Sequence, residues 1–151
     1  MSHFRKALIL LSAVLSVLAA PVVAGQAGDG TARLAIQISD HDPATFNKAL
    51  NVATNSARGM SEKGDFYEIE IVTFNAGLHM LRSDTSPVLD RIQSISESIP
   101  EVTFSACGNT IAGMTRKEGA EPPITEHAGV VTAGVVRLME LDNEGYFIIR
   151  P

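Results

Sequence analysis

Hydrophobic residues in this chain follow two patterns: short continuous runs, and longer stretches in which they recur every three or four positions. A continuous run is typical of a strand buried on both faces, whereas the wider spacing places apolar side chains along one side of a helix. The runs predict strands at 34–38, 68–74, 102–106, 129–132 and 146–149. The periodic stretches predict helices at 44–60, 88–99, 108–117 and 134–141, with Ser86 and Pro87 as N-cap and first turn of the second.

Strands and helices that alternate in this way predict parallel strands joined by right-handed crossovers, which deliver helices to both faces of a sheet. We therefore expect an α/β fold, a three-layer α/β/α sandwich around a five-stranded parallel sheet. The chain has 151 residues, of which 45% are hydrophobic, enough for one core but not two. Residues 33–151 are expected to form a single domain.

The first 24 residues have the organisation of a secretory signal peptide. Arg5 and Lys6 form a basic start, an apolar run covers 7–20, and small residues precede a cleavage site predicted after Ala24. The apolar run is shorter than the roughly 20 residues needed to span a bilayer, so the alternative, an uncleaved membrane anchor, is disfavoured. Residues 25–32 are Gly-rich and predicted to be a flexible lead-in. The expected location is the periplasm, with no stable membrane insertion after cleavage.

Charge and missing motifs exclude several classes of function. Twelve Lys and Arg against 17 Asp and Glu give a formal net charge of −5, which argues against nucleic acid as a partner. The single cysteine, Cys107, rules out an internal disulfide, a multi-cysteine zinc site and a CxxC dithiol. No GxGxxG, GxxxxGK[ST] or GxSxG motif is present, so we predict no nucleotide cofactor and no serine-hydrolase elbow.

The remaining chemistry lies where the predicted strands end, because ligand sites of open parallel sheets form beyond the carboxyl ends of the strands. Cys107 stands between the third strand and a helix start, where free N–H groups and the helix dipole lower a thiol pKa. Gly108 would let the backbone approach a bound group, and Asn109 and Thr110 would donate hydrogen bonds. The alternative is that Cys107 is a buried packing residue.

Histidines and an asparagine follow the other strands. Asn75 ends the second strand, with His79 one turn later as a candidate general acid or base, and His41 follows the first strand in an Asp/Pro turn. Each could also have a purely structural role. Metal ligation by His41, His79 and His127 together is disfavoured, because no two of them have helix-face spacing. Arg82 is expected to be solvated, or else to steer an anionic substrate.

Three segments resemble the DsrE-like (YchN-like) family. In chain order, they are 72–81 (VTFNAGLHML), 104–110 (FSACGNT) and 133–138 (AGVVRL). The resemblance implies a five-stranded parallel sheet in an α/β/α sandwich, assembly into trimers or hexamers, and sulfur trafficking in which a cysteine carries persulfide sulfur. By the same resemblance, Cys107 matches the family's cysteine after the third strand, and Asn75 and His79 fall in its other recurrent segment.

The leading hypothesis is thus a sulfur carrier or sulfurtransferase-like protein, in which Cys107 holds sulfur as a persulfide and His79 and Asn75 tune the site. Its partners would be sulfur donor and acceptor proteins or small sulfur species. One alternative is a non-catalytic oligomeric binding module in which Cys107 is structural and the helices at 46–60 or 135–141 form the subunit interface. Another is a small-ligand or metal-binding protein that uses His41, His79 and Asn75.

Overall fold

The computed structural model describes residues 30–151, which form five strands and four α-helices together with one 3-10 helix, η1. The elements in chain order are β1 (Ala32–Ile38), α1 (Pro43–Lys63), β2 (Tyr67–Thr73), η1 (Asn75–Leu81), α2 (Leu89–Ser98), β3 (Val102–Cys107), α3 (Gly108–Glu118), β4 (Gly129–Val131), α4 (Gly134–Asn143) and β5 (Phe147–Ile149). No helix of this part of the chain is both long and apolar enough to cross a bilayer.

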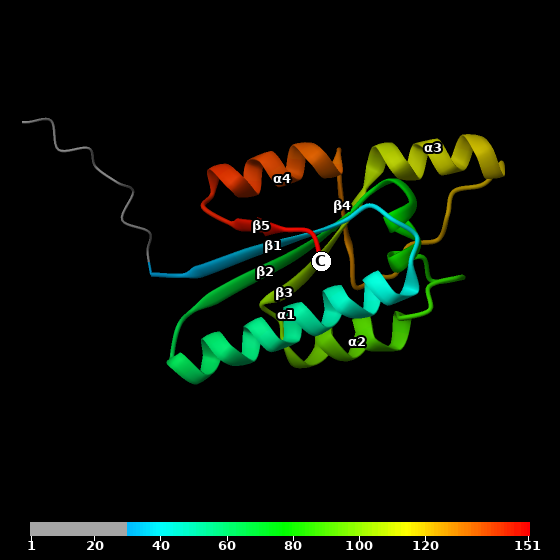
Figure 1. Ribbon diagram of the computed structural model, residues 1–151. Helices are drawn as coiled ribbons and strands as arrows, with labels where there is room; N and C mark the ends of the chain where they lie inside the picture. The colour runs from blue at the N-terminus through cyan, green and yellow to red at the C-terminus, as the bar shows by residue number, and fades with distance from the viewer. Residues whose placement is uncertain (1–29) are drawn as a thin grey trace, which may run out of the picture.

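The strands form one parallel sheet in the order β4-β3-β2-β1-β5. Helices α1 and α2 lie on one side of it, and α3 and α4 lie on the other (Figure 1). The predicted three-layer α/β/α sandwich with a five-stranded parallel sheet is confirmed. Because the strands are parallel, their carboxyl ends meet at one edge of the sheet, where β2 leads into η1 and β3 leads directly into α3.

The first helix shows how local sequence sets the boundaries of an element. Asp42 is the N-cap of α1, and its carboxylate accepts hydrogen bonds from the Ala44 N–H at 3.0 Å and the Thr45 N–H at 3.2 Å. Pro43 occupies the first helical position, where its missing N–H costs nothing. Gly64 ends the helix with φ 80°, a left-handed conformation that favours glycine.

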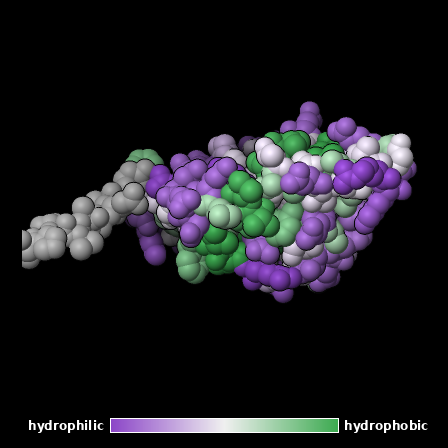
Figure 2. Space-filling view, turned by 90° about the horizontal axis from the view of Figure 1, so that it is seen from above, coloured by the Kyte–Doolittle hydropathy of each residue, from purple (hydrophilic) through white to green (hydrophobic). Residues whose placement is uncertain are grey.

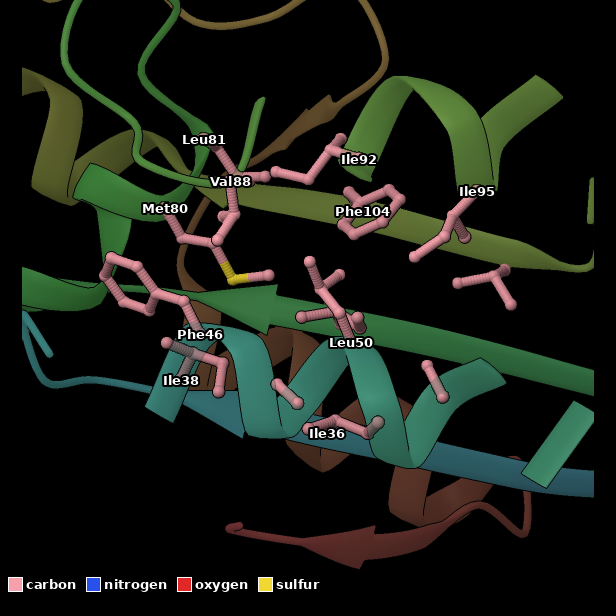
Figure 3. Close-up of a cluster of buried hydrophobic side chains, with 14 of the residues drawn as sticks. Ile36, Ile38, Phe46, Leu50, Met80, Leu81, Val88, Ile92, Ile95 and Phe104 are labelled. Carbon is pink, nitrogen blue, oxygen red and sulfur yellow. The ribbon is translucent and has the colours of Figure 1, made fainter. Parts of the chain in front are cut away.

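The two faces of the sheet carry cores of very different size. Between the sheet and helices α1 and α2, side chains such as Phe46, Leu50 and Phe104 form a large buried cluster (Figure 3). Beneath α4 the buried cluster is small, and its members are Ala35, Val72, Leu138 and Leu141. The α1/α2 side therefore supplies most of the hydrophobic stabilisation, while α4 is held by few apolar contacts.

Two local predictions need correction. The lead-in predicted for 25–32 ends too late, because Ala32 already belongs to β1 and donates an N–H hydrogen bond to the Phe66 carbonyl at 2.8 Å. Helix α2 begins at Leu89, and Ser86 is not its N-cap. Its hydroxyl donates to the Met80 carbonyl at 2.6 Å and accepts from the Val88 N–H at 3.3 Å, so Ser86 joins the loop before α2 to η1. The predicted signal peptide, 1–24, lies outside the described residues.

Candidate functional site

A pocket of about 670 Å³ opens at the carboxyl ends of β2 and β3. Its walls come from η1, α3 and the first turn of α4, and it brings together Cys107, His79, Asn75, Asn109 and Thr110, five of the residues selected from the sequence. The other lining residues are Phe74, Ala76, Gly113, Met114, Lys117, Glu118, Ala133, Gly134 and Val135. Three separate chain segments therefore meet at the sulfur-bearing end of β3.

Cys107 is the N-cap residue of α3; it is only 5% exposed but lines this pocket. Burial by itself raises the pKa of the Cys107 thiol. The Thr110 hydroxyl and the N–H groups of Gly134, Thr110 and Asn109 act in the opposite direction and hold the pKa below its ordinary value. The starts of two helices, α3 and α4, thus face one sulfur, an arrangement that favours its thiolate form.

Thr110 connects the thiol to the end of β2. Its hydroxyl oxygen accepts a hydrogen bond from the Asn75 N–H at 3.0 Å, which leaves the hydroxyl hydrogen free to donate toward the Cys107 sulfur. Asn75 has φ 50°, a left-handed conformation that asparagine tolerates better than most residues. The turn at Asn75 therefore orients the hydroxyl that stabilises the thiolate.

His79 lies on η1 and stacks on the ring of His41, with ring centroids 4.2 Å apart and planes 8° from parallel. Its Nδ1 atom is buried and has no hydrogen-bond partner within residues 30–151. Burial lowers the pKa of His79, and electrostatic repulsion from the neighbouring His41 and Arg82 lowers it further, against the opposing effect of Glu118 and Asp84. His79 is therefore a neutral imidazole near pH 7, able to accept a proton at the pocket.

This stack makes a prediction that NMR can check. In a His41→Ala variant, the His79 ring becomes more accessible to water and loses a repulsive neighbour, so its pKa should rise toward the ordinary histidine value. The measurement is a pH titration of the His79 ring resonances. His127→Ala serves as the control, because His127 lines a different hollow and should leave the titration unchanged. A His79 pKa that stays constant or falls in His41→Ala contradicts the assigned cause.

Several residues selected from the sequence lie elsewhere. Gly108 is not among the lining residues: it faces β4, and a Cβ there would lie 3.0 Å from the Val131 carbonyl oxygen. It thus permits close packing of α3 on β4 rather than close approach of a ligand. His41 reaches the pocket only through His79, and His127 lines a separate hollow beside β3 and β4.

Arg82 is neither solvated nor free to steer a substrate. It is buried, donates to both carboxylate oxygens of Glu118 at 2.8 and 2.9 Å, and pairs with Asp84 at 2.8 Å. The hydrogen bonds to the Arg82 guanidinium hold the pKa of Asp84 at about 2. Arg82 therefore anchors the last turn of α3 to the loop after η1.

Sequence reasoning missed the contribution of α4. Gly134 supplies an N–H beside the sulfur and packs so closely on Phe74 that a Cβ would lie 2.9 Å from its ring. The signal was present in the chain, since Gly134 starts a helix just after the fourth strand, as Gly108 does after the third. No group of three or more His, Cys, Asp or Glu side chains able to hold a metal ion occurs in residues 30–151.

Comparisons with known proteins support the fold. The chain matches no protein-family model and no curated protein. Among solved structures, it is similar to a protein of unknown function, MTH1491, from Methanobacterium thermoautotrophicum. The two share 25% sequence identity with a TM-score of 0.67, over 80% of this chain and 99% of the archaeal one. The likeness supports the α/β/α architecture and leaves the chemistry to be argued from the pocket.

Proposed function

We propose that this protein is a sulfur carrier or sulfurtransferase-like protein in which Cys107 is the nucleophile. The observation that carries the proposal is that one shielded sulfur lies in a pocket and is surrounded by donors from two helix starts and a threonine hydroxyl. Such surroundings stabilise an anion on sulfur, whether thiolate or persulfide. The resemblance to the DsrE-like family, whose cysteine follows the third strand, supports the same assignment.

The chemistry needs two displacement steps. In the first, the Cys107 thiolate attacks a sulfane sulfur of a polysulfide; a sulfur–sulfur bond forms as another breaks, and a shortened polysulfide anion leaves. In the second, an acceptor thiolate attacks the outer sulfur of the Cys107 persulfide and releases the Cys107 thiolate. Thr110, Asn109 and the Gly134 N–H stabilise the anion in both resting forms. His79 takes the proton from an incoming thiol, while Asn75 orients Thr110 and His41 supports His79.

Intact mass spectrometry tests the proposal directly. After incubation with polysulfide and removal of the excess, the wild-type protein should gain whole sulfur atoms, and a reductant should remove them. Cys107→Ser should gain none, because Cys107 is the only cysteine of the chain. A wild-type mass that stays unchanged, or a Cys107→Ser protein that loads equally, contradicts the proposal.

A second candidate function, a non-catalytic assembly module, is favoured by exposed apolar side chains around α4. Val130, Val135, Val136 and Met139 are each at least 50% exposed, and hydrophobic surface gathers on this side of the molecule (Figure 2). Homotrimers or homohexamers, as the resemblance implies, would cover such a surface. Analytical ultracentrifugation of wild type and Met139→Lys tests whether α4 serves assembly. If Met139→Lys no longer assembles but its Cys107 still loads sulfur, α4 serves assembly alone.

Export to the periplasm is proposed from residues 1–24, which lie outside the described part of the chain. Expression of the full chain in a Gram-negative host should yield a periplasmic protein whose first residue is Gly25. N-terminal sequencing of the osmotic-shock fraction checks this. Uncleaved protein in the membrane fraction would favour the anchor instead.

A further inference from the structure

An ion pair between a buried carboxylate and a partly buried arginine ties α4 to the middle of the sheet, outside the pocket. Glu70 of β2 has a side chain only 8% exposed, and its Oε2 lies 2.8 Å from Arg137 Nη2 of α4. Arg137 Nε donates to the other oxygen of Glu70 at 3.0 Å, and the Ser105 hydroxyl donates to that oxygen at 2.6 Å. Both carboxylate oxygens are thus satisfied by β3 and α4, which makes this a strong, directional contact.

Helix α4 gains less stabilisation from buried apolar side chains than α1 and α2 do, so its polar contacts matter more. Its buried apolar cluster is small, and its outer residues Val135, Val136 and Met139 are exposed. The Arg137 guanidinium also contacts Glu140 of the same helix and Glu144 at its C-cap, both at 3.3 Å, so it is held from several sides. The Glu70–Arg137 pair is therefore one of the contacts that set the position of α4 over the sheet, together with the packing of Gly134 on Phe74.

The ion pair and the thiol are neighbours along the same face of the sheet. Ser105 precedes Cys107 by two residues on β3, so both side chains point toward α4, about 7 Å apart along the strand. On α4, Arg137 follows Gly134 by three residues, which is about one helical turn. Gly134 is the residue whose N–H faces the sulfur. A shift of α4 that breaks the Glu70–Arg137 contact would therefore also move the Gly134 N–H.

We propose that the Glu70–Arg137 ion pair is a positioning device that holds the first turn of α4 against the Cys107 sulfur. Neither residue is a catalytic residue, because neither is placed against the sulfur; both act through the Gly134 N–H. The inference rests on the proposed role of Cys107 as a reactive thiol. It assigns a function to the buried carboxylate of Glu70, which takes no part in the sulfur transfer itself.

The test is the rate of Cys107 alkylation by iodoacetamide as a function of pH. The key variant is the double substitution Glu70→Leu/Arg137→Met, which removes both charges at once and leaves no unpaired buried charge, a replacement that folded proteins often tolerate. We expect its alkylation rate at pH 7 to fall about 3- to 10-fold, the size of one weakened hydrogen bond to a thiolate, with a melting temperature close to that of wild type.

Two further variants complete the design. Glu70→Gln keeps the shape and hydrogen-bonding capacity of the side chain but weakens the contact with Arg137, so we expect a smaller fall in the alkylation rate. If the double variant does not fold, Glu70→Gln provides the test of the positioning role. Arg58→Met removes one cation from α1, on the opposite side of the sheet, and should alkylate like wild type. His79, Lys117 and Glu118, the other titratable groups lining the pocket, are unchanged in every variant.

The outcomes are distinguishable. Suppose that the wild-type thiol is acidic and that folded Glu70→Leu/Arg137→Met has the same pH profile as wild type. This result overturns the positioning role and leaves the proposed function standing. If only Glu70→Gln folds, the same comparison is made with Glu70→Gln. A wild-type thiol that titrates at or above the ordinary cysteine value overturns the proposed function as well. A fall in the Arg58→Met rate equal to that of the double variant shows that the loss of any cation, and not the position of α4, slows alkylation, and likewise overturns the positioning role.

Discussion

Replacing Gly77 with alanine is expected to lower the free energy of unfolding by about 3 kcal/mol or more. A Cβ at this position would lie 2.3 Å from the Ile38 carbonyl oxygen, 2.6 Å from its carbonyl carbon and 2.8 Å from the Ser39 nitrogen. All three are backbone atoms at the end of β1, so no side-chain rotation relieves the clash. Either η1 leaves the sheet or β1 is pushed out of register.

The same substitution should also disturb the pocket. η1 begins at Asn75 and carries His79, so its displacement separates both from Cys107 and Thr110. Urea unfolding measures the loss of stability, and Gly59→Ala is the matched control. A Cβ at Gly59, in the middle of α1, meets nothing within 4 Å and should stabilise the protein by up to about 1 kcal/mol. A Gly77→Ala protein as stable as wild type would show that η1 does not pack on β1 as described.

Replacing Thr110 with valine is expected to slow alkylation of Cys107 at pH 7 about tenfold. Valine keeps the shape of threonine but removes the hydroxyl that donates toward the sulfur. Burial, which raises the thiol pKa, is then opposed only by backbone N–H groups, so the pKa rises. A hydrogen bond to a charged group contributes about 1.5–3 kcal/mol, and one pKa unit corresponds to about 1.4 kcal/mol, which gives a shift on the order of one unit.

The measurement is the pH profile of iodoacetamide alkylation, in which the Thr110→Val midpoint should lie at higher pH than that of wild type. At pH values above both midpoints the two rates should converge, because the thiol is then fully ionised in each protein. Thr115→Val controls for the substitution itself: Thr115 is on the same helix, but its hydroxyl donates to the Ile111 carbonyl at 2.9 Å. A Thr110→Val profile that coincides with that of wild type contradicts the role given to this hydroxyl.

Much of the fold could be predicted from the sequence because its elements are locally encoded. Continuous apolar runs such as the one in β2 and the periodic spacing of Phe46, Leu50 and Ala53 in α1 depend only on nearby residues. The strand and helix boundaries predicted from these patterns differ from the observed ones by only a few residues. Ser86 looks like an N-cap from the sequence because it precedes a proline, whereas α2 begins only at Leu89 and the Ser86 hydroxyl donates to the Met80 carbonyl.

The candidate site could be predicted in part. Asn75, His79 and Cys107 were selected because parallel strands end at one edge, and the pocket does bring them together. The burial of Arg82 could not be predicted, because its partner Glu118 lies 36 residues away and the loops between them set the distance. The same holds for the stacking of His41 on His79 and for the N–H of Gly134 beside the sulfur.

Patterns among neighbouring residues are enough to predict the strands and the α-helices, and to place a lone cysteine where β3 becomes α3. The alternation of these elements along the chain predicts that the strands are parallel. Three contacts are visible only in the folded chain: the first N–H of α4 lies beside that cysteine, Thr110 bridges Cys107 and Asn75, and Glu70 of β2 pairs with Arg137 of α4. These contacts join residues far apart in the chain, so their distances depend on how whole layers pack.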